Sequence, residues 1–357
     1  MVGLKKTISA EIVADSINSM GDRITSFLLT YPRIIHAELM THRVFSRNSA
    51  SSRAIPFEKM VESVRTDPFI PIAWQVAHKG MQGTKYLTKS AHVDFRRSQW
   101  LVARDSAIKH AEELNSTMGV RYSMDEDPHQ LADTSVTKQL CNRLLEPFMW
   151  HTVLITATEF EGFFELRCPK YFGQYKSWKD AVSSGATLET PFEFRMNDSQ
   201  AEIHIQALAE AMWDARNESI PIKLKDGDWH IPFGDRITLP PTIPIDAGYT
   251  LEQGVAIRKV KIATARCARL SYMTFDGEIN YVKDIGLHDT LLASHHMSPF
   301  EHCARAMNSD EYIQFDRASP RIINGKMNKF FVDIEQAWCN NFRGFIPYRW
   351  FIENGTS

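Results

Sequence analysis

The sequence has no apolar run that approaches the roughly 20 residues a membrane-spanning helix needs. Residues 1–21 also lack the uninterrupted apolar core of a secretory signal peptide, so we expect a cytoplasmic protein. Five cysteines, an odd number without a CxxC pair, argue against a disulfide framework and a zinc site. With 41 basic and 43 acidic residues the net charge is −2, so no charge excess points to nucleic acid or an anionic membrane.

Several catalytic motifs are missing as well. Neither a Walker A sequence nor a GxGxxG fingerprint is present, which argues against a Rossmann dinucleotide fold. No GxSxG elbow accompanies Ser51 and His42, so a serine hydrolase is not indicated. Three histidines and a glutamate lie within 295–302, but the HExxH spacing is absent and we expect no metal site.

The residues that are present describe a globular protein, with 43% hydrophobic and 24% charged side chains. Residues 23–31, RITSFLLTY, are rich in β-branched and aromatic types and predict a strand. Pro32 suits the first turn of a helix, which we expect to continue to Thr41. Apolar positions at helical spacing predict a longer helix over 92–115.

Another helix is predicted where apolar residues recur every three or four positions from Ala201 to Ala215. Ser199, three residues before Glu202, predicts a capping box at its start. Residues 168–198 show no clean period and are interpreted as an insertion. The Pro-rich residues 239–249 are the best linker candidate.

The strongest local signal is the segment 41–53, THRVFSRNSASSR, with three arginines, one histidine and four serines. Guanidinium groups and short hydroxyls are suited to a phosphate and to the polar edge of a pyrimidine. On composition alone, a solvated serine-rich loop with ordinary surface arginines is an equally good interpretation.

This segment resembles flavin-dependent thymidylate synthases, which carry Arg-His-Arg, seven residues and then Ser. Here His42 and Arg43 are followed by VFSRNSA and then Ser51, with Asn48 and Arg53 in register.

The segment departs from the family pattern at four positions. Thr41 replaces the first arginine, Ser49 replaces a glutamate and Ala54 replaces an aromatic residue. Glu38 stands where the family often has glutamine.

Two matching segments lie far along the chain. Residues 268–272, ARLSY, include Ser271 and resemble the family's Ala-Arg-x-Ser segment. Residues 296–302, HMSPFEH, resemble its His-x-(Thr/Ser)-Pro-Phe-Glu-His segment. A structural interpretation of the second segment is an N-cap serine, a first-turn proline and a capping-box glutamate, which any helix could use. A helix N-terminus is also an anion site, so the two interpretations are compatible.

The remaining matches lie in 142–147, 156–167 and 200–203. By position, Arg143 and Arg167 match the family's substrate-phosphate arginines. Where the family has polar flavin contacts, chiefly Asn and Arg, this chain departs from it and has Thr156, Thr158 and Gly162.

The order of these segments is changed, since those near 270 and 300 precede the Arg-His-Arg motif in the family. A circular permutation would explain this order, because it is tolerated where chain ends lie close together at the surface. We therefore expect 1–357 to form one permuted domain in which 23–55, 140–215 and 256–306 build one site. The tail 340–351 has no assigned role beyond packing.

The resemblance implies an α+β fold with a central mixed sheet flanked by helices, and a homotetramer with flavin sites between subunits. It implies reductive methylation of dUMP to dTMP with FAD, methylenetetrahydrofolate as carbon donor and NADPH as reductant. An alternative on the same fold is C5 hydroxymethylation of dUMP or dCMP. A third is a catalytically inactive relative that binds nucleotide or serves only in assembly.

The resemblance also assigns residues, in three groups. The group at the reacting centre is Ser51, Arg53 and Arg167. The group that would bind the pyrimidine nucleotide is Glu38, Ser51, Ser52, Arg53, Arg143 and Arg167. The group that would line the flavin is His42, Arg43, Asn48, Ser271, His296, Ser298 and Glu301.

Overall fold

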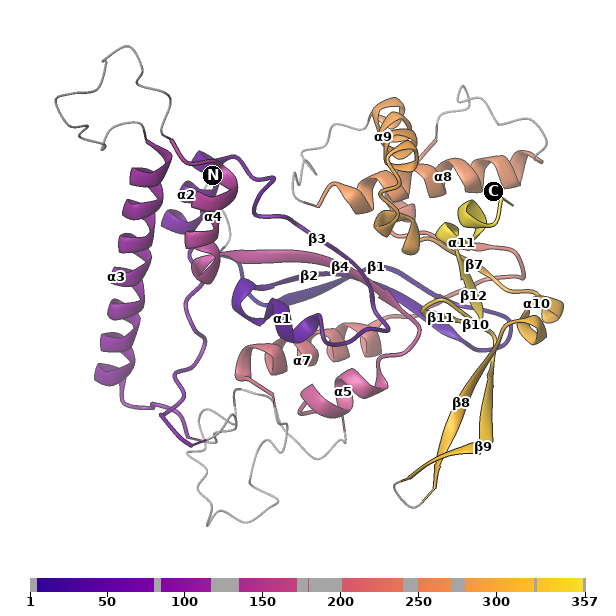
Figure 1. The fold of residues 1–357 in the computed structure, drawn as a ribbon, viewed down its shortest axis with the longest axis horizontal. Coiled ribbons are helices and arrows are strands. Elements are labelled where there is room, and N and C mark those ends of the chain that lie inside the picture. Colours follow the sequence, from indigo (N-terminus) through magenta and orange to yellow (C-terminus); the bar gives the residue numbers. More distant parts are fainter. Residues whose placement is uncertain are drawn as a thin grey trace.

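The computed structural model describes residues 5–79, 85–116, 135–171, 179, 201–239, 250–270, 280–323 and 326–355. A central sheet runs through the molecule, with three helices standing at one end of it and a mixed helical and β region at the other (Figure 1). The expected insertion 168–198 and linker 239–249 lie almost wholly outside the described residues.

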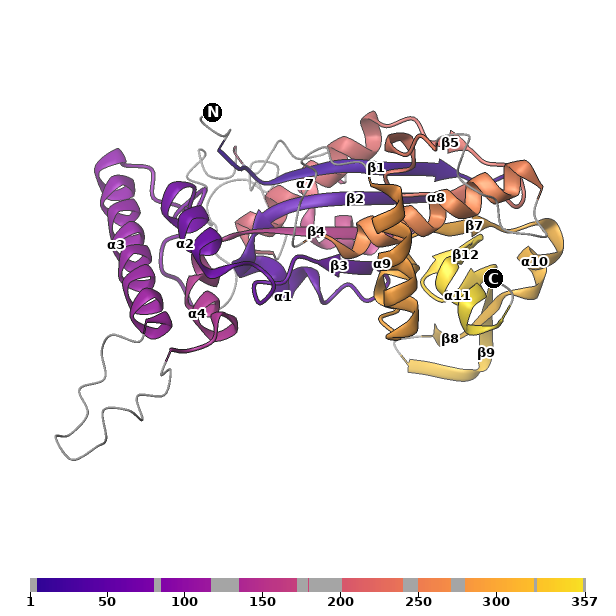
Figure 2. The ribbon, with the colours of Figure 1, turned by 90° about the horizontal axis from the view of Figure 1, so that it is seen from above.

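The main sheet has five strands in the order β3-β4-β2-β1-β5. Its members are β1 (Ser9–Ile17), β2 (Arg23–Pro32), β3 (Ser46–Ser49), β4 (Trp150–Ala157) and β5 (Ile222–Lys223). The pairs β1–β2, β2–β4 and β3–β4 are antiparallel, whereas β1–β5 is parallel. The long strands β1, β2 and β4 lie side by side across the middle of the molecule (Figure 2). The sheet is therefore mixed, as expected.

The predicted strand 23–31 is confirmed as β2. It is a central strand whose side chains are almost all buried, because both faces of the sheet are covered. Phe27, Leu29 and Tyr31 pack on one face against α5 (Glu161–Arg167) and α7 (Ile203–Glu218). Leu28 packs on the other face, in a cluster with Phe233, Cys267 and Leu270. The strand thus forms the core between two layers.

A three-helix unit stands beside the strand ends. It consists of α2 (Phe57–Thr66), α3 (Ser90–Asn115) and α4 (Lys138–Leu145), followed by the short η3 (Glu146–Phe148). The prediction of a helix over 92–115 is confirmed as α3. Apolar side chains from all three helices form a core of their own, which includes Val64, Ile108 and Leu145.

The other end of the molecule contains the following elements: β6 (Trp229–His230), η5 (Gly234–Arg236), α8 (Leu251–Ala268), α9 (Tyr281–Ala293), η6 (Ser298–Glu301), β7 (Ala304–Ala306), α10 (Ser309–Gln314), β8 (Asp316–Ile323), β9 (Lys326–Gln336), β10 (Trp338–Cys339), β11 (Phe342–Arg343), β12 (Phe345–Pro347) and α11 (Tyr348–Glu353). β12, β7 and β6 make a second small sheet, and β8 pairs with β9 as an antiparallel hairpin. The tail 340–351 therefore belongs to the folded body.

The helix expected after Pro32 is confirmed in part. Pro32 ends β2, and a 3-10 turn η1 (Arg33–Ile35) continues into α1 (His36–Leu39). The backbone N–H of Thr41 still bonds to the Glu38 carbonyl oxygen at 3.2 Å, which closes the last turn.

The helix predicted over 201–215 is confirmed as α7, but the proposed capping box is wrong. Glu202 is itself the N-cap, and its carboxylate accepts a hydrogen bond from the backbone N–H of His204 at 2.8 Å. Ser199 lies outside the described residues. The N-cap position is set by the side chain that reaches the free N–H groups, which spacing alone does not show.

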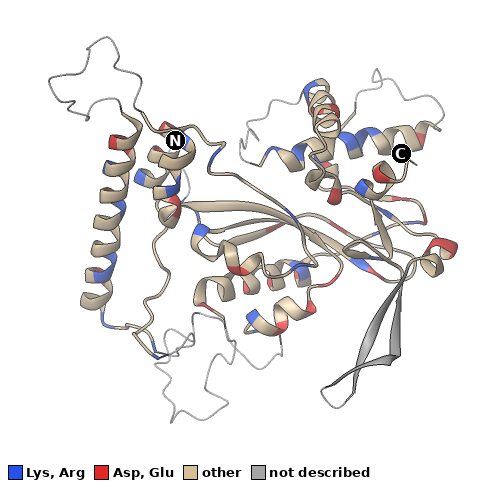
Figure 3. Cartoon of the chain, viewed as in Figure 1, with Lys and Arg blue, Asp and Glu red and all other residues tan. Residues whose placement is uncertain are grey.

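No helix within the described residues is long and apolar enough to cross a membrane. All five cysteines are buried free thiols. Lys and Arg are interspersed with Asp and Glu over most elements (Figure 3), in agreement with the small net charge.

Candidate functional site

The segment 41–53 follows α1 and contains β3. In β3, Arg47 lies opposite Ile155 of β4, and Asn48 lies opposite Leu154. Because side chains alternate along a strand, Arg47 faces the layer of α1 and α5, while Asn48 faces the layer of α8. The Arg47 guanidinium donates to the carbonyl oxygens of Met40 (2.8 Å) and His42 (3.2 Å), which fixes the turn between α1 and β3.

Three of the predicted site residues come together on the α1 side. The His42 ring packs edge-on against Phe163 at 4.8 Å, and the Arg167 guanidinium lies 5.8 Å from the centre of the same ring. Glu38 of α1 interacts electrostatically with Arg167 at the end of α5. His42 Nε2 and Arg167 Nε are buried without a hydrogen-bond partner. These two nitrogens are the groups here that a ligand could engage.

The electrostatics of this cluster are those of an anion site. Burial, then the charges of Arg167 and Arg47, lower the pKa of His42 to about 4. Burial, then Arg33 and Arg47, lower the pKa of His36 to about 4 in the same way. Both imidazoles are therefore neutral near neutral pH, and the arginines keep their charge. A positive potential beside two neutral hydrogen-bonding rings suits a phosphate or a polarised carbonyl oxygen.

Glu38 is the acidic residue of this cluster. Burial and the neighbouring Glu202 raise the pKa of Glu38, while Arg167 and His204 lower it. A carboxylate beside a guanidinium can accept a hydrogen bond from an N–H group of the ligand while the guanidinium donates to an adjacent oxygen. The polar edge of a uracil ring has this alternation of N–H and carbonyl oxygen.

A second network connects the end of the motif to η1 and β4. Ser52 donates to the Glu146 carboxylate at 2.6 Å, and Arg33 lies 3.6 Å from the same carboxylate. Arg33 also contacts His151 Nε2 at 3.1 Å, and His151 packs edge-on against His36 at 4.5 Å. Ser52 is thus held within the protein on the α1 side of the sheet.

The other predicted contacts lie on the opposite face. Ser298 of η6 donates to the Arg47 carbonyl oxygen at 3.1 Å and to the Asn48 side chain. Asn48 in turn donates to the Cys267 carbonyl oxygen at 3.2 Å. Glu301 pairs with Arg349 of α11 at 2.5 Å. These bonds bring the segments near 48, 267 and 298 together, although they are far apart in the chain.

The capping interpretation of the segment 296–302 is confirmed for the first-turn proline, Pro299, and wrong for the N-cap serine and its capping box. Ser298 begins a four-residue 3-10 helix whose N-cap, Met297, makes no side-chain cap bond. The Ser298 hydroxyl is used instead to attach η6 to β3. Tertiary contact therefore decides the role of this serine.

The remaining predicted residues do not converge on either group. Arg43, Arg53, Arg143 and His296 are exposed. Ser51 is half-buried in the turn after β3, where its carbonyl oxygen accepts a bond from Ala54 N–H at 3.0 Å. Ser271 lies outside the described residues.

The residues predicted to line a flavin do not form a cradle within one chain. His42 lies on the α1 side of the sheet, whereas Asn48 and Ser298 lie on the α8 side and bond to each other. The Glu301 carboxylate is paired with Arg349. These last three side chains are thus engaged within the protein, and because His42 lies on the other side of the sheet, the set within one chain does not fit a flavin.

Glu38, His42 and Arg167, with the residues around them on the α1 side of the sheet, are called the α1 cluster. Sequence reasoning missed several of its members. Arg47 lies inside the 41–53 motif but received no role, although its charge acts on both His36 and His42. Phe163 lies in the matching segment 156–167 but received no role, and Arg33 lies in no matching segment. No group of three or more His, Cys, Asp or Glu side chains suited to a metal occurs among the described residues.

Comparison with known proteins gives little further information. No protein-family model matches the chain, and no curated protein matches it in sequence. A solved structure, a UMP/dUMP methylase, PolB, from Streptomyces cacaoi bound with 5-Br UMP, matches with a TM-score of 0.38 and 16% sequence identity. The match covers 59% of this chain and 89% of that one. We base nothing on a similarity of this size.

Proposed function

We propose that this chain is an enzyme that modifies C5 of a pyrimidine deoxynucleotide, by reductive methylation of dUMP to dTMP. The observation that carries the proposal is the convergence of Glu38, His42 and Arg167 around Phe163. These residues belong to two segments that resemble the family and lie more than 100 residues apart in the sequence.

In this proposal Arg167 donates to the nucleotide, and Glu38 accepts a hydrogen bond from its N–H edge. Donation to a uracil carbonyl oxygen draws electron density toward that oxygen and stabilises the enolate that forms when C5 acts as a nucleophile. Neutral His42 can accept or donate a hydrogen bond beside the ring. A methylene carbon from methylenetetrahydrofolate would bond to C5 while its bonds to the folate nitrogens break, the C5 proton would leave, and a hydride would complete the methyl group.

FAD and NADPH, as sources of the reducing hydride, belong to the same proposal. Because the flavin residues are split between two faces of one chain, a flavin site would need a second subunit, as in the homotetramer that the resemblance implies. No residue of this chain is assigned a step with the flavin.

The test has two stages. First, calorimetric titration of the full chain with dUMP should show binding that Arg167→Ala weakens strongly and Arg97→Ala, at an exposed arginine of α3, leaves nearly unchanged. Equal losses of dUMP affinity in both variants would show that the α1 cluster is not part of the nucleotide site.

Second, the chain is incubated with dUMP, FAD, methylenetetrahydrofolate and NADPH, and the mass of the nucleotide product is measured by mass spectrometry. A gain of one methylene unit supports methylation, and a gain of a hydroxymethyl group identifies the alternative reaction. Binding without any product would leave a nucleotide-binding protein that is not an enzyme.

A further inference from the structure

A cavity of about 380 Å³ lies at the edge of the main sheet, far along β2 from the α1 cluster and beside the two-residue strand β5. Its walls come from residues 12–16 of β1, from 219–224, from 229–235 and from α8. At about 30 Å³ for each molecule of liquid water, this volume equals about a dozen waters. It is within the range of small-molecule sites.

Most of the lining is apolar. The apolar side chains that line it include Ile12, Val13, Ile222, Leu224, Trp229 and Ile231. Ile220 is 91% exposed and Ile222 67% exposed, so the rim also presents apolar surface to solvent. A ligand that fills this space therefore has an apolar body.

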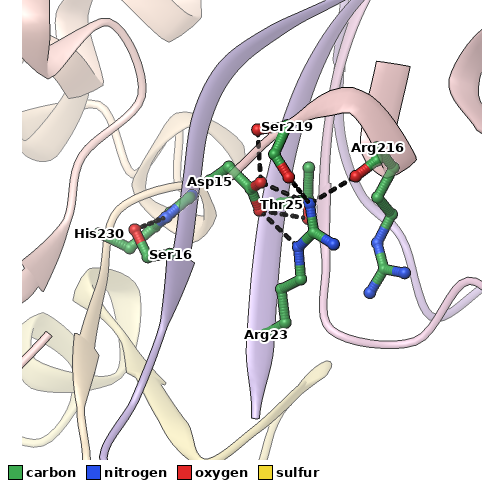
Figure 4. A network of polar contacts seen from close by, with 7 residues as sticks. All are labelled: Asp15, Ser16, Arg23, Thr25, Arg216, Ser219 and His230. Carbon is green, nitrogen blue, oxygen red and sulfur yellow. Dashed lines mark hydrogen bonds and ion pairs between the residues drawn. The ribbon is translucent and has the colours of Figure 1, made fainter. Parts of the chain in front are cut away.

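The acid in the wall is not available for ligand recognition. Asp15 accepts two hydrogen bonds from Arg23, at 2.9 and 2.6 Å, one from Thr25 at 3.0 Å and one from Ser219 at 2.7 Å. Figure 4 shows these donors gathered around the carboxylate. A carboxylate has about four acceptor positions, so Asp15 is saturated and its charge is compensated by Arg23.

Ser16 is a polar residue of the cavity wall that can bond to a ligand. Its Oγ is hydrogen-bonded to His230 Nδ1 at 2.9 Å (Figure 4). Burial lowers the pKa of His230 to about 3, so the ring is neutral near neutral pH. When His230 Nδ1–H is the donor in this bond, Ser16 Oγ accepts it and the single hydroxyl hydrogen of Ser16 can be donated to a ligand oxygen.

Lys259 of α8 supplies a positive charge to the lining. It is half-buried, and it forms no ion pair with another described residue. Arg258, Lys261 and Arg266 lie on the same helix, in which Glu252 is the single acid. The exposed Asp235 at the rim favours an anion of one charge over a dianion such as a phosphate.

We propose that this cavity is a second small-molecule site, separate from the nucleotide site, and that it takes an apolar monocarboxylate. The carboxylate pairs with Lys259 and accepts a hydrogen bond from Ser16, and the apolar body lies against Trp229 and the isoleucines of the wall.

The probe for this site is 2-naphthoate, which has about as many non-hydrogen atoms as the cavity has room for waters. Calorimetric titration of the full chain compares it with the neutral 2-naphthamide and with the cationic 2-naphthylmethylamine. We expect naphthoate to bind most tightly. No binding of naphthoate at millimolar concentration, or tighter binding of the amine, overturns the proposal.

Three variants locate the probe. Lys259→Gln should weaken naphthoate about fivefold, as expected for a partly exposed ion pair, and leave naphthamide unchanged. Lys223→Gln, at an exposed lysine of β5 outside the lining, should change neither. Arg167→Ala and saturating dUMP should also leave naphthoate binding unchanged. If either of these abolishes it, the probe occupies the nucleotide site and the second site is refuted, whatever the outcome for dUMP itself.

Discussion

A buried chain of hydrogen bonds crosses the sheet and predicts how stability depends on pH. From Ser16 it continues through His230 to Ser26 (2.9 Å), on to Thr156 (2.6 Å) and then to His302 Nδ1 (2.9 Å). Ser26 and Thr156 lie directly opposite each other on β2 and β4, so the sheet register holds the centre of the chain.

Burial and the neighbouring His230 lower the pKa of His302 to about 3. Histidine in an unfolded chain has a pKa of about 6.5, so the unfolded state binds more protons between these two values. Stability therefore falls as the pH drops below about 6.5, by up to about 1.4 kcal/mol per pH unit for one histidine. Between about pH 7.5 and pH 5 this amounts to about 2 kcal/mol for His302.

His302→Asn tests this reasoning, because an asparagine amide can replace Nδ1 in the bond to Thr156 but does not titrate. At about pH 7.5 the variant should be less stable by about 1–3 kcal/mol, since a smaller side chain leaves unfilled space. Its stability should then fall about 2 kcal/mol less than that of the wild type on acidification to about pH 5.

The measurement is urea unfolding at a series of pH values, followed by circular dichroism. His92→Asn, at an exposed histidine of α3, is the matched control and should keep the pH dependence of the wild type. If His302→Asn and the wild type lose the same free energy between the two pH values, His302 is not a buried neutral imidazole and the reasoning fails.

Four further outcomes follow from the contacts. Arg167→Ala should weaken dUMP binding by about thirtyfold, or about 2 kcal/mol, and affect flavin binding far less; equal losses of both in titrations would mean that the arginine is misassigned. Ser51→Ala should slow turnover without abolishing it, and intact-protein mass spectrometry after acid quench should find no nucleotide adduct that depends on Ser51. Ser298→Ala removes the hydrogen bonds from η6 to β3 and should lower the free energy of unfolding by about 1–2 kcal/mol, measured in urea; an unchanged free energy would show that these hydrogen bonds do not contribute to stability. Burial and Glu161 raise the pKa of Glu159 to about 7, above its unfolded value, so this carboxyl lowers stability as the pH rises from about 5 to 8, opposite in sign to the buried histidines; Glu159→Gln should therefore gain more stability than the wild type over this range, and equal gains in the two proteins would contradict this.

The sequence predicted elements whose signal is local. The strand 23–31 and the helices 92–115 and 201–215 are present, because β-branched runs and helical spacing of apolar residues need no distant partner to be recognised. The helix starts were less accurate. Glu202 is the N-cap in place of the predicted Ser199, because the cap is the side chain that reaches a free N–H group in the folded backbone.

For the candidate site, the sequence by itself determined which residue types are available for chemistry: a serine- and arginine-rich segment and an arginine at the end of an aromatic helix. Only the tertiary structure decided on which side of the sheet each residue lies. Arg47 and Asn48 are neighbours in sequence but face opposite layers of the sheet, because side chains alternate along β3. Glu38 and Arg167 are far apart in sequence but meet beside Phe163, because β2 and β4 pair and bring α1 and α5 to the same face. Residue type is fixed by the chain, whereas proximity depends on strand register and layer packing, which no single segment contains.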